Sequence, residues 1–397
     1  MSWQEVALGD CFTIKHGWAF KSQYFGDSGE HIVLTPGNFY EPGGFRSRPG
    51  KDRFYTIEPP DDFVLRPGDL VIAMTEQGEG LLGSSALIPE DGSYLHNQRI
   101  GLIENLDERK LIKWFLYRLF NTPQVRGQIQ ATASGTKVRH TAPKRIYKIK
   151  VAIPPVSIQR KISDILSAYD DLIENNRRRI ALLEEAARLL YREWFVHFRF
   201  PGHEHVKIID GLPEGWEPRT LVELAEVVMG QSPKSQYYNE AGDGLPFHQG
   251  VTDYGFRFVS HRIYSTAVTK LAEAGDILVS VRAPVGRINI TRDKIVLGRG
   301  LAAVRSRTEH QSFLLYALKN RFYSEDIIGT GAIYAATNKK ELEGQILIEP
   351  HKVVLAEFEE QARDIDQIIE NLTTQNEKLA QARNLLLPRL MNGEIAV

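Results

Sequence analysis

The chain has 397 residues, of which 42% are hydrophobic and 25% charged, and its formal net charge is −1. One ordinary hydrophobic core cannot accommodate this length, so we expect two or more domains, and the near-zero charge disfavours a uniformly basic polyanion binder. The single cysteine, Cys11, excludes an internal disulfide, and the N-terminal residues lack the pattern of a signal peptide. Because no apolar run approaches about eighteen residues, we expect a cytoplasmic protein without a membrane span.

The first part of the chain, up to residue 153, contains short apolar segments separated by turn residues. Residues 64–72 predict a Pro-Gly-Asp turn followed by a buried strand, and residues 111–120 predict a helix. A polar, glycine-containing loop at 74–80 follows the strand. Residues 134–150 carry six lysine and arginine residues and no acidic residue, which indicates either a phosphate-binding segment or a solvated strand edge.

A long helix is predicted from Ser157 to about Phe198. Pro154 and Pro155 precede it, Ser157 can cap its first turn, and Pro201-Gly202 follows its end. Apolar residues recur at heptad spacing on two positions of this helix. One position holds Leu166, Ile173, Ile180, Ala187 and Trp194, and the other holds Ile162, Tyr169, Leu183 and Leu190.

The second half predicts the same order of elements. Residues 273–279 predict a Gly-Asp turn and a buried strand, a polar loop follows at 281–286, and residues 313–320 predict a helix. A second long helix is predicted from about Leu355 to Leu387, and each long helix would measure roughly 50–60 Å at about 1.5 Å per residue. Its heptad positions hold Phe358, Ile365, Leu372, Leu379 and Leu386.

The two halves are also related residue by residue. A shift of 196 positions carries Gly135, Thr141 and Ile146 onto Gly331, Thr337 and Leu342, and the same shift relates the two long helices. Earlier segments repeat with slightly different shifts, as expected when loops differ in length: Trp3 with Trp216, residues 66–72 with 273–279, and residues 115–117 with 314–316. The sequence therefore predicts two copies of one unit, each a globular part followed by a long helix.

These patterns predict an α+β fold, in which two mixed α/β domains are separated by two long antiparallel coiled-coil helices with an internal pseudo-two-fold repeat. The apolar seams most simply pair with each other, and Asn176 and Asn376, which interrupt them, can fix the register. The expected boundaries are a first domain at 1–153, a first long helix at 154–202, a second domain at 203–350 with a linker at 203–215, and a second long helix at 351–397. The candidate seam and partner-contact residues are Leu166, Ile173, Ile180, Leu183, Leu190, Trp194, Ile365, Leu372, Leu379 and Leu386.

The sequence lacks the motifs of common enzymes. It has no Gly-x-x-x-x-Gly-Lys-Ser/Thr loop, no Gly-x-Gly-x-x-Gly after a strand and no Asn-Pro-Pro-aromatic tetrapeptide of an amino-methyltransferase. Joining Pro60-Asp61 to residues 108–110 gives only a loose nuclease pattern, and Cys11 with His16 lacks a third partner. His203-Glu204-His205 lies in a polar linker, where a solvated loop is favoured over a metal site. A binding protein is therefore favoured over an enzyme.

The polar loops after the two Gly-Asp strands differ in side-chain chemistry while the strands agree, as expected of one scaffold that presents two different readers. In the DNA major groove, Gln77 can pair with adenine and Arg282 with guanine, although ordinary divergent surface loops would have the same pattern. The run of arginines at 177–179 is interpreted as a solvated helix face. The candidate DNA-binding residues are Thr75, Gln77, Arg99, Ser134, Gly135, Thr136, Lys137, Arg139, Ser280, Arg282, Arg299, Tyr334, Asn338 and Lys339.

Three segments resemble a known family. Residues 154–166, PPVSIQRKISDIL, are similar to the entry of the central conserved helix in specificity subunits of type I restriction–modification enzymes. Residues 182–204 and 385–395 resemble other signatures of that family, as do the Gly-Asp turns and Ser134-Gly-Thr136. The resemblance covers essentially the whole chain. The second copy departs from it at Pro350-His-Lys-Val, which leaves the exact start of its helix open.

This resemblance implies a DNA sequence reader that has no catalytic site and binds no cofactor or metal itself. Each of two target-recognition domains would read one half of a split site on double-stranded DNA, and the paired helices would separate the domains and dock two modification (methyltransferase) subunits. Those subunits would bring S-adenosylmethionine and methylate adenine, and two restriction subunits would add ATP- and Mg²⁺-dependent translocation and cleavage.

Because the two halves differ outside their framework, we expect a non-palindromic site whose half-sites lie about one helical turn, roughly 34 Å, apart. Two other classes stay open at this point. One is a standalone nuclease or methyltransferase, and the other is a coiled-coil scaffold that binds only proteins. The recognised bases are not predicted from the sequence.

Overall fold

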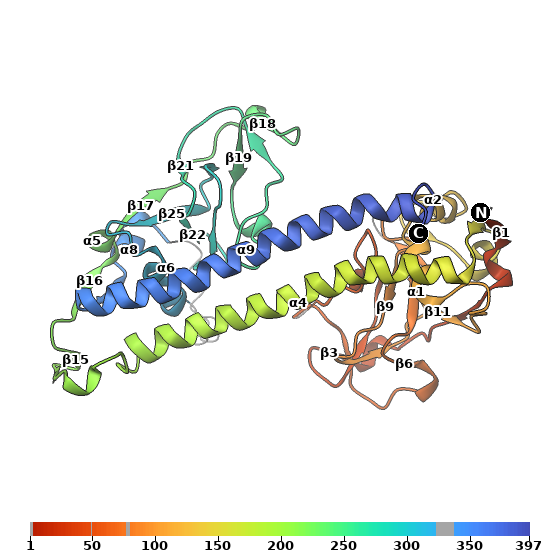
Figure 1. The fold of residues 1–397 in the computed structure, drawn as a ribbon, viewed down its shortest axis with the longest axis horizontal. Coiled ribbons are helices and arrows are strands. Elements are labelled where there is room, and N and C mark those ends of the chain that lie inside the picture. Colours follow the sequence, from red (N-terminus) through yellow and green to blue (C-terminus); the bar gives the residue numbers. More distant parts are fainter. Residues whose placement is uncertain (1–2, 49, 77–79, 323–336) are drawn as a thin grey trace. The chain divides into compact units, whose positions relative to one another are not determined.

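The structure, a computed structural model, describes residues 3–48, 50–76, 80–322 and 337–397 (Figure 1). The chain forms two compact units, which we call unit 1 (Met1–Glu174 with Asn376–Val397) and unit 2 (Asn175–Gln375). The two long helices, α4 (Val156–Phe195) and α9 (Lys352–Met391), each contribute one part to unit 1 and the other part to unit 2. Each unit therefore consists of one sheet-rich domain and a segment of both helices.

The domain of unit 1 is built on two main sheets. Its helices are α1 (Lys113–Phe120), α2 (Pro123–Ala131) and α3 (Pro143–Ile146). A five-stranded sheet has the order β3 (Phe25–Gly26), β5 (Phe54–Tyr55), β4 (His31–Val33), β10 (Ser93–Leu95) and β6 (Val64–Leu65). A four-stranded sheet has the order β2 (Thr13–His16), β11 (Ile100–Glu104), β7 (Leu70–Ala73) and β9 (Ser85–Leu87). Two antiparallel pairs join β1 (Gln4–Ala7) to β13 (Lys150–Ile153), and β8 (Thr75–Glu76) to β12 (Arg139–His140).

The domain of unit 2 has sheets of the same sizes. Its helices are α5 (Leu221–Leu224), α6 (Gln311–Phe322) and α8 (Lys339–Glu343). The five-stranded sheet has the order β18 (Tyr238–Asn239), β20 (Tyr264–Ser265), β19 (Leu245–His248), β24 (Ile295–Leu297) and β21 (Leu271–Ala272). The four-stranded sheet has the order β17 (Ala225–Met229), β25 (Leu301–Ser306), β22 (Ile277–Ser280) and β23 (Ile288–Ile290). The pairs are β14 (Ile208–Ile209) with β15 (Leu212–Pro213), and β16 (Glu217–Thr220) with β26 (Ile346–Glu349).

The strands predicted after the Gly-Asp turns are confirmed as β7 and β22, and they lie at the centre of each core. Leu70 and Ile72 face the helices of unit 1, whereas Val71 and Ala73 pack on the opposite side of the same strand. Because both faces of β7 and β22 are buried, their sequences are continuous apolar runs rather than alternating ones. In each turn the aspartate accepts a hydrogen bond from a backbone N–H three residues earlier, at 2.8 Å for both Asp69 and Asp276.

The predicted helices are also confirmed, with small differences at their ends. Helix α4 starts at Val156, one residue before the predicted start, so Ser157 lies inside the first turn instead of capping it. It ends at Phe195 because the chain then turns, and Phe198 adopts a left-handed backbone conformation with a φ of 57°. Helix α9 begins at Lys352 and continues through Pro388 to Met391. None of the described helices is long and apolar enough to cross a membrane.

In unit 1, parts of both long helices pack against the domain. Gln159 of α4 accepts a hydrogen bond from the backbone N–H of Ile112 at 3.0 Å and so caps the start of α1. About three helical turns further along α4, Asp170 binds Arg118 of α1 and, at 2.6 Å, Arg383 of α9. The buried apolar contacts on the helices come from Ile162, Leu166, Leu390 and Met391.

In unit 2, the contacts between the domain and the helices are more aromatic. Phe358 of α9 lies against Phe195 of α4, with ring centroids 4.8 Å apart, and both rings contact Phe313 of α6. Glu359 of α9 caps α6 by accepting hydrogen bonds from the backbone N–H groups of Ser312 and Phe313, at 3.2 and 2.9 Å. The residues that form this core on the two helices are Ala187, Tyr191, Trp194, Phe195, Val354, Leu355, Phe358 and Ala362.

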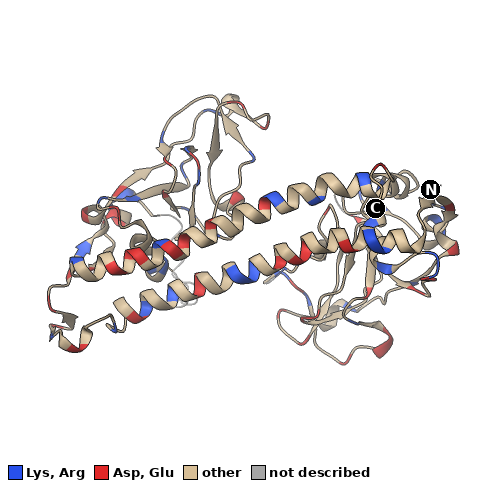
Figure 2. Ribbon diagram, in the orientation of Figure 1, with Lys and Arg blue, Asp and Glu red and all other residues tan. Residues whose placement is uncertain are grey.

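All ten predicted seam residues lie on α4 or α9, and each is buried or half-buried. Ile180, Ile369 and Leu372 form a small separate core within unit 2. Figure 2 shows groups of acidic and basic residues following one another along both helices, and the run of arginines at 177–179 is exposed. Of the predicted seam residues, Leu166, Ile173, Ile180, Trp194 and Leu372 are buried, and Leu183, Leu190, Ile365, Leu379 and Leu386 are half-buried.

Candidate nucleic-acid interface

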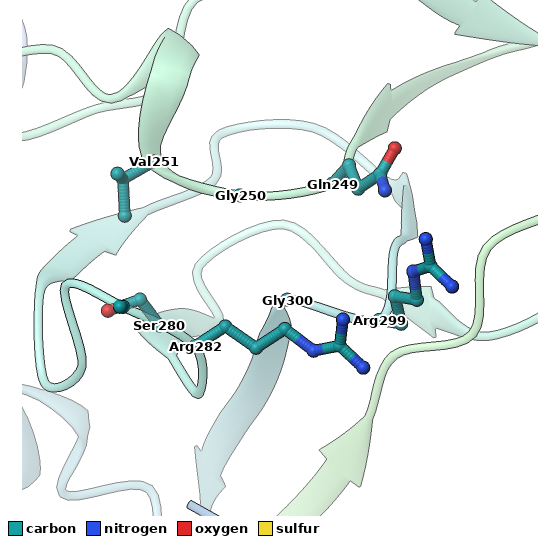
Figure 3. A pocket seen from close by; sticks show the side chains of 8 residues that line it. Gln249, Gly250, Val251, Ser280, Arg282, Arg299 and Gly300 are labelled. Carbon is teal, nitrogen blue, oxygen red and sulfur yellow. The ribbon is translucent and has the colours of Figure 1, made fainter. Parts of the chain in front are cut away.

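A small recess in unit 2 brings together three of the predicted DNA-binding residues, Ser280, Arg282 and Arg299 (Figure 3). It has a volume of about 120 Å³ and lies where the ends of β19 and β22 meet the start of β25. Three chain segments that are distant in sequence form its walls. They contribute Gln249, Gly250 and Val251, then Ser280, Arg282 and Ala283, and finally Arg299 and Gly300.

The recess depends on two glycines that let two backbone segments come close together. The N–H of Gly298 donates to the carbonyl of His248 at 2.8 Å, and the N–H of Gly300 donates to the carbonyl of Gln249 at 3.1 Å. A Cβ atom at residue 298 would lie 2.6 Å from the Cα of Gln249, and one at residue 300 would collide with the carbonyl of Gln249. Arg299 is held between these two glycines, with its side chain exposed.

The loop that carries Arg282 is anchored by Ser280. The hydroxyl of Ser280, which is buried, donates to the carbonyl of Pro284 at 2.6 Å and accepts from the backbone N–H of Arg287 at 2.8 Å. Ser280 therefore fixes the conformation of the loop and is not itself a free group for a ligand. A pre-ordered loop loses less conformational entropy when it binds.

The two arginines of the recess are electrostatically uncompensated. Arg282 and Arg299 are both exposed, and neither guanidinium has a hydrogen bond or an ion pair with any residue that the structure describes. The recess lining contains no acidic residue. Other arginines of the same domain are paired, such as Arg305, whose guanidinium binds the carboxylate of Asp276 through two bonds at 2.7 and 2.8 Å. The recess is therefore suited to a ligand that presents hydrogen-bond acceptors or negative charge.

Behind Gln249, a chain of two histidines and a carboxylate leads from the core to the surface. His248 Nε2 lies 2.8 Å from His261 Nδ1, and His261 Nε2 lies 2.9 Å from the carboxylate of Asp293. Burial, with the neighbouring His261 in support, lowers the pKa of His248 to about 4, so His248 is neutral near pH 7. The chain of hydrogen bonds holds the end of β19, from which Gln249 projects into the recess.

In unit 1 the corresponding edge of the sheet carries Thr75 and Arg99. The N–H of Met74 donates to the carbonyl of Arg99 at 3.0 Å, which places these two predicted residues beside each other. Thr75 is buried, and its hydroxyl lies 3.2 Å from Nδ1 of the exposed His140. Arg99 is exposed, and its side chain has no partner within the described ranges.

Five predicted residues of unit 1 lie in one tight hairpin between Ser134 and His140. The backbone groups of Ser134 and His140 exchange two hydrogen bonds, at 2.9 and 2.8 Å. Gly135 has a φ of 97°, and a Cβ atom there would collide with the carbonyl oxygen of Val138, so the turn requires glycine. Thr136 and Lys137 are exposed at the tip, where a hydroxyl and an ammonium group can bind phosphate.

Arg139 has a different position from the hairpin tip. Its guanidinium lies 3.2 Å from the carboxylate of Glu76, which is almost completely buried, and donates to the carbonyl of Gln130 at 2.7 Å. Glu76 also accepts from the backbone N–H of Leu82 at 2.7 Å. These contacts link Arg139 to Glu76 at the end of β8 and to Gln130 in α2, so its guanidinium has a structural role.

Among the other predicted residues, Asn338 caps α8, because its side chain accepts from the N–H of Glu341 at 3.0 Å. Lys339 pairs with Glu343 at 3.4 Å. Gln77 and Tyr334 lie outside the residues that the structure describes. Sequence reasoning missed Gln249, which follows a strand without a turn motif, and only the glycines on both sides of Arg299 hinted at a close approach there.

The chain matches the family described as the type I restriction modification DNA specificity domain over residues 1–185 and 213–381. It is 31% identical over 310 residues to a putative type I restriction enzyme MjaX specificity subunit of Methanocaldococcus jannaschii, covering 75% of this chain and 67% of that one. It is 22% identical to the EcoBI specificity subunit of Escherichia coli, covering 78% of this chain and 66% of that one.

The fold is also similar to a solved structure. The crystal structure of the S subunit of a type I restriction–modification system from M. genitalium matches with a TM-score of 0.59 and 16% identity, over 98% of this chain and 96% of that one. The family match spans most of the chain and includes the segments that carry Gln249, Arg282, Arg299 and the Ser134–His140 hairpin. The chain thus belongs to the family of type I restriction–modification DNA specificity subunits, which are the non-catalytic, DNA-binding members of these systems.

Proposed function

We propose that this specificity subunit reads a bipartite, non-palindromic site on double-stranded DNA, with one half-site bound by each domain. The recess of unit 2 carries this proposal, because it presents an amide and two guanidinium groups that have no partner among the described residues, on a frame fixed by hydrogen bonds. In unit 1, the tip of the Ser134–His140 hairpin and Arg99 supply the corresponding contacts. Arginine and lysine that contact phosphate or base edges provide most of the affinity of DNA-binding proteins.

We further propose that the two domains are copies of one unit related by a pseudo-two-fold, as the sequence repeat predicts. Their strand orders correspond, and equivalent backbone hydrogen bonds support the alignment. The N–H of Thr141 donates to the carbonyl of Met74, and the N–H of Thr337 donates to that of Val281, at 3.0 and 2.9 Å. The N–H groups of Met74 and Val281 in turn donate to the residues just before β11 and β25.

This alignment supports a non-palindromic site. It makes Leu34, Thr75 and Gln98 of unit 1 equivalent to Gln249, Arg282 and Arg299 of unit 2. Unit 2 presents an exposed amide and two cations at these positions. Unit 1 instead has the buried Leu34, Thr75 bonded to His140, and the neutral amide of Gln98. Since these groups offer different hydrogen-bond patterns, the two domains require different bases in their half-sites.

For the assembly, we propose the arrangement that the family resemblance implies, located in the cytoplasm. The domains at 1–153 and 203–350 contact DNA, and the helices at 154–202 and 351–397 pair as an antiparallel coiled coil. Their outer faces dock two modification subunits, and two restriction subunits complete the enzyme. S-adenosylmethionine, ATP and Mg²⁺ then bind to those partner subunits and not to this chain. Exposed apolar residues at equivalent helix positions, Leu189 and Leu385, support two similar docking sites.

The direct test is single-molecule methylation sequencing of DNA from cells that express this chain with its modification subunit. We expect methyladenine in one split, non-palindromic motif, and we expect the motif to disappear when this chain is omitted. If an assembled complex changes no methylation and binds no duplex DNA at low salt, where phosphate contacts are strongest, the scaffold alternative is correct.

A second experiment tests whether each domain reads one half-site. Residues 1–150 are exchanged for those of a related specificity subunit of known site, and the methylation motif is sequenced again. We expect only one half of the motif to change. A change in both halves would show that the domains do not read independently.

A further inference from the structure

We propose that Arg282 and Arg299 each bind the major-groove edge of a guanine, so that the half-site read by unit 2 contains two guanines. This inference rests on the proposed function and deepens it, because it names the bases that one domain selects. A guanidinium group donates two parallel hydrogen bonds, which match the O6 and N7 acceptors of guanine. It is the commonest specific contact between proteins and DNA.

Both guanidinium groups are exposed and line the same recess. Figure 3 shows the side chains of Arg282 and Arg299 extending past the recess, with the amide of Gln249 on the same side as Arg299. Neither guanidinium is neutralised within the described part of the chain, and no acidic residue lines the recess. Two such cations close together repel each other until acceptors from a ligand bind them.

The side chains that line the recess match a base edge better than a phosphate. A phosphate presents acceptors alone, so it can use only the NH2 group of a nearby amide and leaves the carbonyl oxygen of that amide without a donor. Gln249 offers a donor and an acceptor beside the two donor-only guanidinium groups. A mixed set of this kind matches the base edges, which present donors and acceptors side by side, whereas phosphate oxygens present acceptors alone.

Hydrogen bonds fix the backbone of the three segments that form the recess. Arg299 lies between Gly298 and Gly300, whose N–H groups bind the backbone of the β19 end. Arg282 stands two residues after the buried hydroxyl of Ser280, which bonds both to Pro284 and to Arg287. Base reading gains from fixed backbone positions, because each guanidinium must reach both acceptors of one base edge at the same time. A phosphate contact places a weaker demand on the backbone.

Replacement by lysine distinguishes the two kinds of contact, because lysine keeps the charge but loses the planar fork. The complex of the full chain with its modification subunit is prepared with Arg282→Lys or Arg299→Lys. We expect each variant to lose discrimination for guanine at one position of the second half-site, by roughly tenfold to a hundredfold, with the first half-site unchanged. Arg287→Lys is the matched control, since Arg287 is exposed on the same loop but does not line the recess.

A change in the DNA provides a second measurement that leaves the protein intact. Replacing a guanine of the half-site with 7-deazaguanine removes the N7 acceptor. We expect the wild-type complex to bind each such duplex about tenfold more weakly, and we expect this loss to vanish in the lysine variant that no longer reads that position. Full discrimination by both lysine variants, together with an unaltered affinity for 7-deazaguanine duplexes, would show phosphate contacts instead and overturn the inference.

The outcomes separate this inference from the proposed function. A split methylation motif whose second half contains no guanine would refute the guanine contacts and leave the reader function intact. Loss of sequence-dependent methylation in every assembled complex, the wild type included, would refute both. The contacts would be established if the second half-site contains two guanines and if the lysine variants and 7-deazaguanine duplexes together link each guanine to one arginine.

Discussion

The guanidinium of Arg257 lies 2.5 Å from the carboxylate of Asp366 on α9, and its side chain is only 3% exposed. It also binds Glu184 of α4 and lies 3.3 Å from the hydroxyl of Tyr316 on α6, so one buried cation from the domain binds both helices within unit 2. Lys319 of α6 completes the group with an ion pair to Glu184 at 2.7 Å. Burial opposes ionisation of Glu184, but Lys319 and Arg257 together bring its pKa below the usual value.

Replacing Arg257 with methionine is therefore expected to destabilise unit 2. The change leaves Asp366 without its cation and Glu184 with only Lys319, and removing one partner of a buried ion pair typically costs about 3–5 kcal/mol. Chemical denaturation followed by fluorescence would measure the loss. Arg262→Met is the control, because Arg262 is largely exposed in its pair with Asp253 and should change the free energy of unfolding by about 1 kcal/mol or less. Equal effects of the two substitutions would contradict a buried role for Arg257.

The cap that Glu359 provides to α6 gives a second test. Its carboxylate, which is 3% exposed in the side chain, accepts from two backbone N–H groups that would otherwise be unsatisfied at the start of the helix. Glu359→Ala should lower the free energy of unfolding by about 1–3 kcal/mol. Glu359→Gln should cost less, because the amide oxygen can still accept one bond. Glu360→Ala on the same helix is the exposed control, and it should leave the thermal midpoint nearly unchanged.

The local patterns of this sequence predicted its elements well. Heptad spacing located α4 and α9 because one apolar stripe of each must be buried, and the Gly-Asp turns located β7 and β22 because their aspartates bind their own turns. The capping contacts and the Arg257 cluster could not be predicted in this way, since they join residues far apart in sequence. Gln159 and Glu359, for instance, perform the same task in the two units, although the 196-residue shift does not align them.

In the candidate site, too, features set by neighbouring residues could be predicted from the sequence, whereas contacts between distant residues could not. Thr136 and Lys137 were predicted as DNA-binding residues of a basic segment, and both are exposed at the hairpin tip. The glycine before them is a local signal for such a turn. Arg139 has the same charge and lies only two residues further on, yet it binds the buried carboxylate of Glu76. The recess of unit 2 required Gln249, which enters it through the pairing of β19 with β24. No short-range pattern encodes that pairing.

Stability is expected to fall in moderately acidic solution because of two buried histidines. Burial lowers the pKa of His96 in unit 1 and of His248 in unit 2 to about 4, below the ordinary value of 6.5. The unfolded chain therefore takes up protons below pH 6.5, while the folded chain does so only near pH 4. Between pH 6.5 and about 4, protonation of the unfolded chain at each histidine lowers the free energy of unfolding by up to roughly 3 kcal/mol. Above pH 6.5 neither histidine changes it.

Unfolding free energies measured from pH 7.5 to 4 check this expectation. His248→Gln removes the titrating ring and keeps a side chain that can bond with His261, so its stability should depend less on pH than that of the wild type. His205→Gln is the control, because His205 is exposed in the linker. The same slope in all three proteins would show that His248 is not responsible.

The hairpin of unit 1 can be tested by Gly135→Ala, which introduces a Cβ atom against the carbonyl of Val138 at a positive φ. The turn must open, and this moves Thr136 and Lys137 away from their present positions. We expect weaker DNA binding by the complex with its modification subunit, and less methylation at every site, while the base preference of the second half-site is kept. The cost in stability should be about 1–3 kcal/mol, as for other residues forced into a strained backbone conformation.

Gly127→Ala is the matched control for this substitution, because Gly127 lies within α2 and has open space around a Cβ atom. Alanine at a helical position should leave binding unchanged and raise stability by up to about 1 kcal/mol. If Gly135→Ala lowers stability but leaves DNA affinity equal to that of Gly127→Ala, the hairpin tip does not contact DNA. A loss of affinity that weakens with added salt would instead identify the contact as ionic, since Lys137 at the tip would release a counterion from the phosphate backbone on binding.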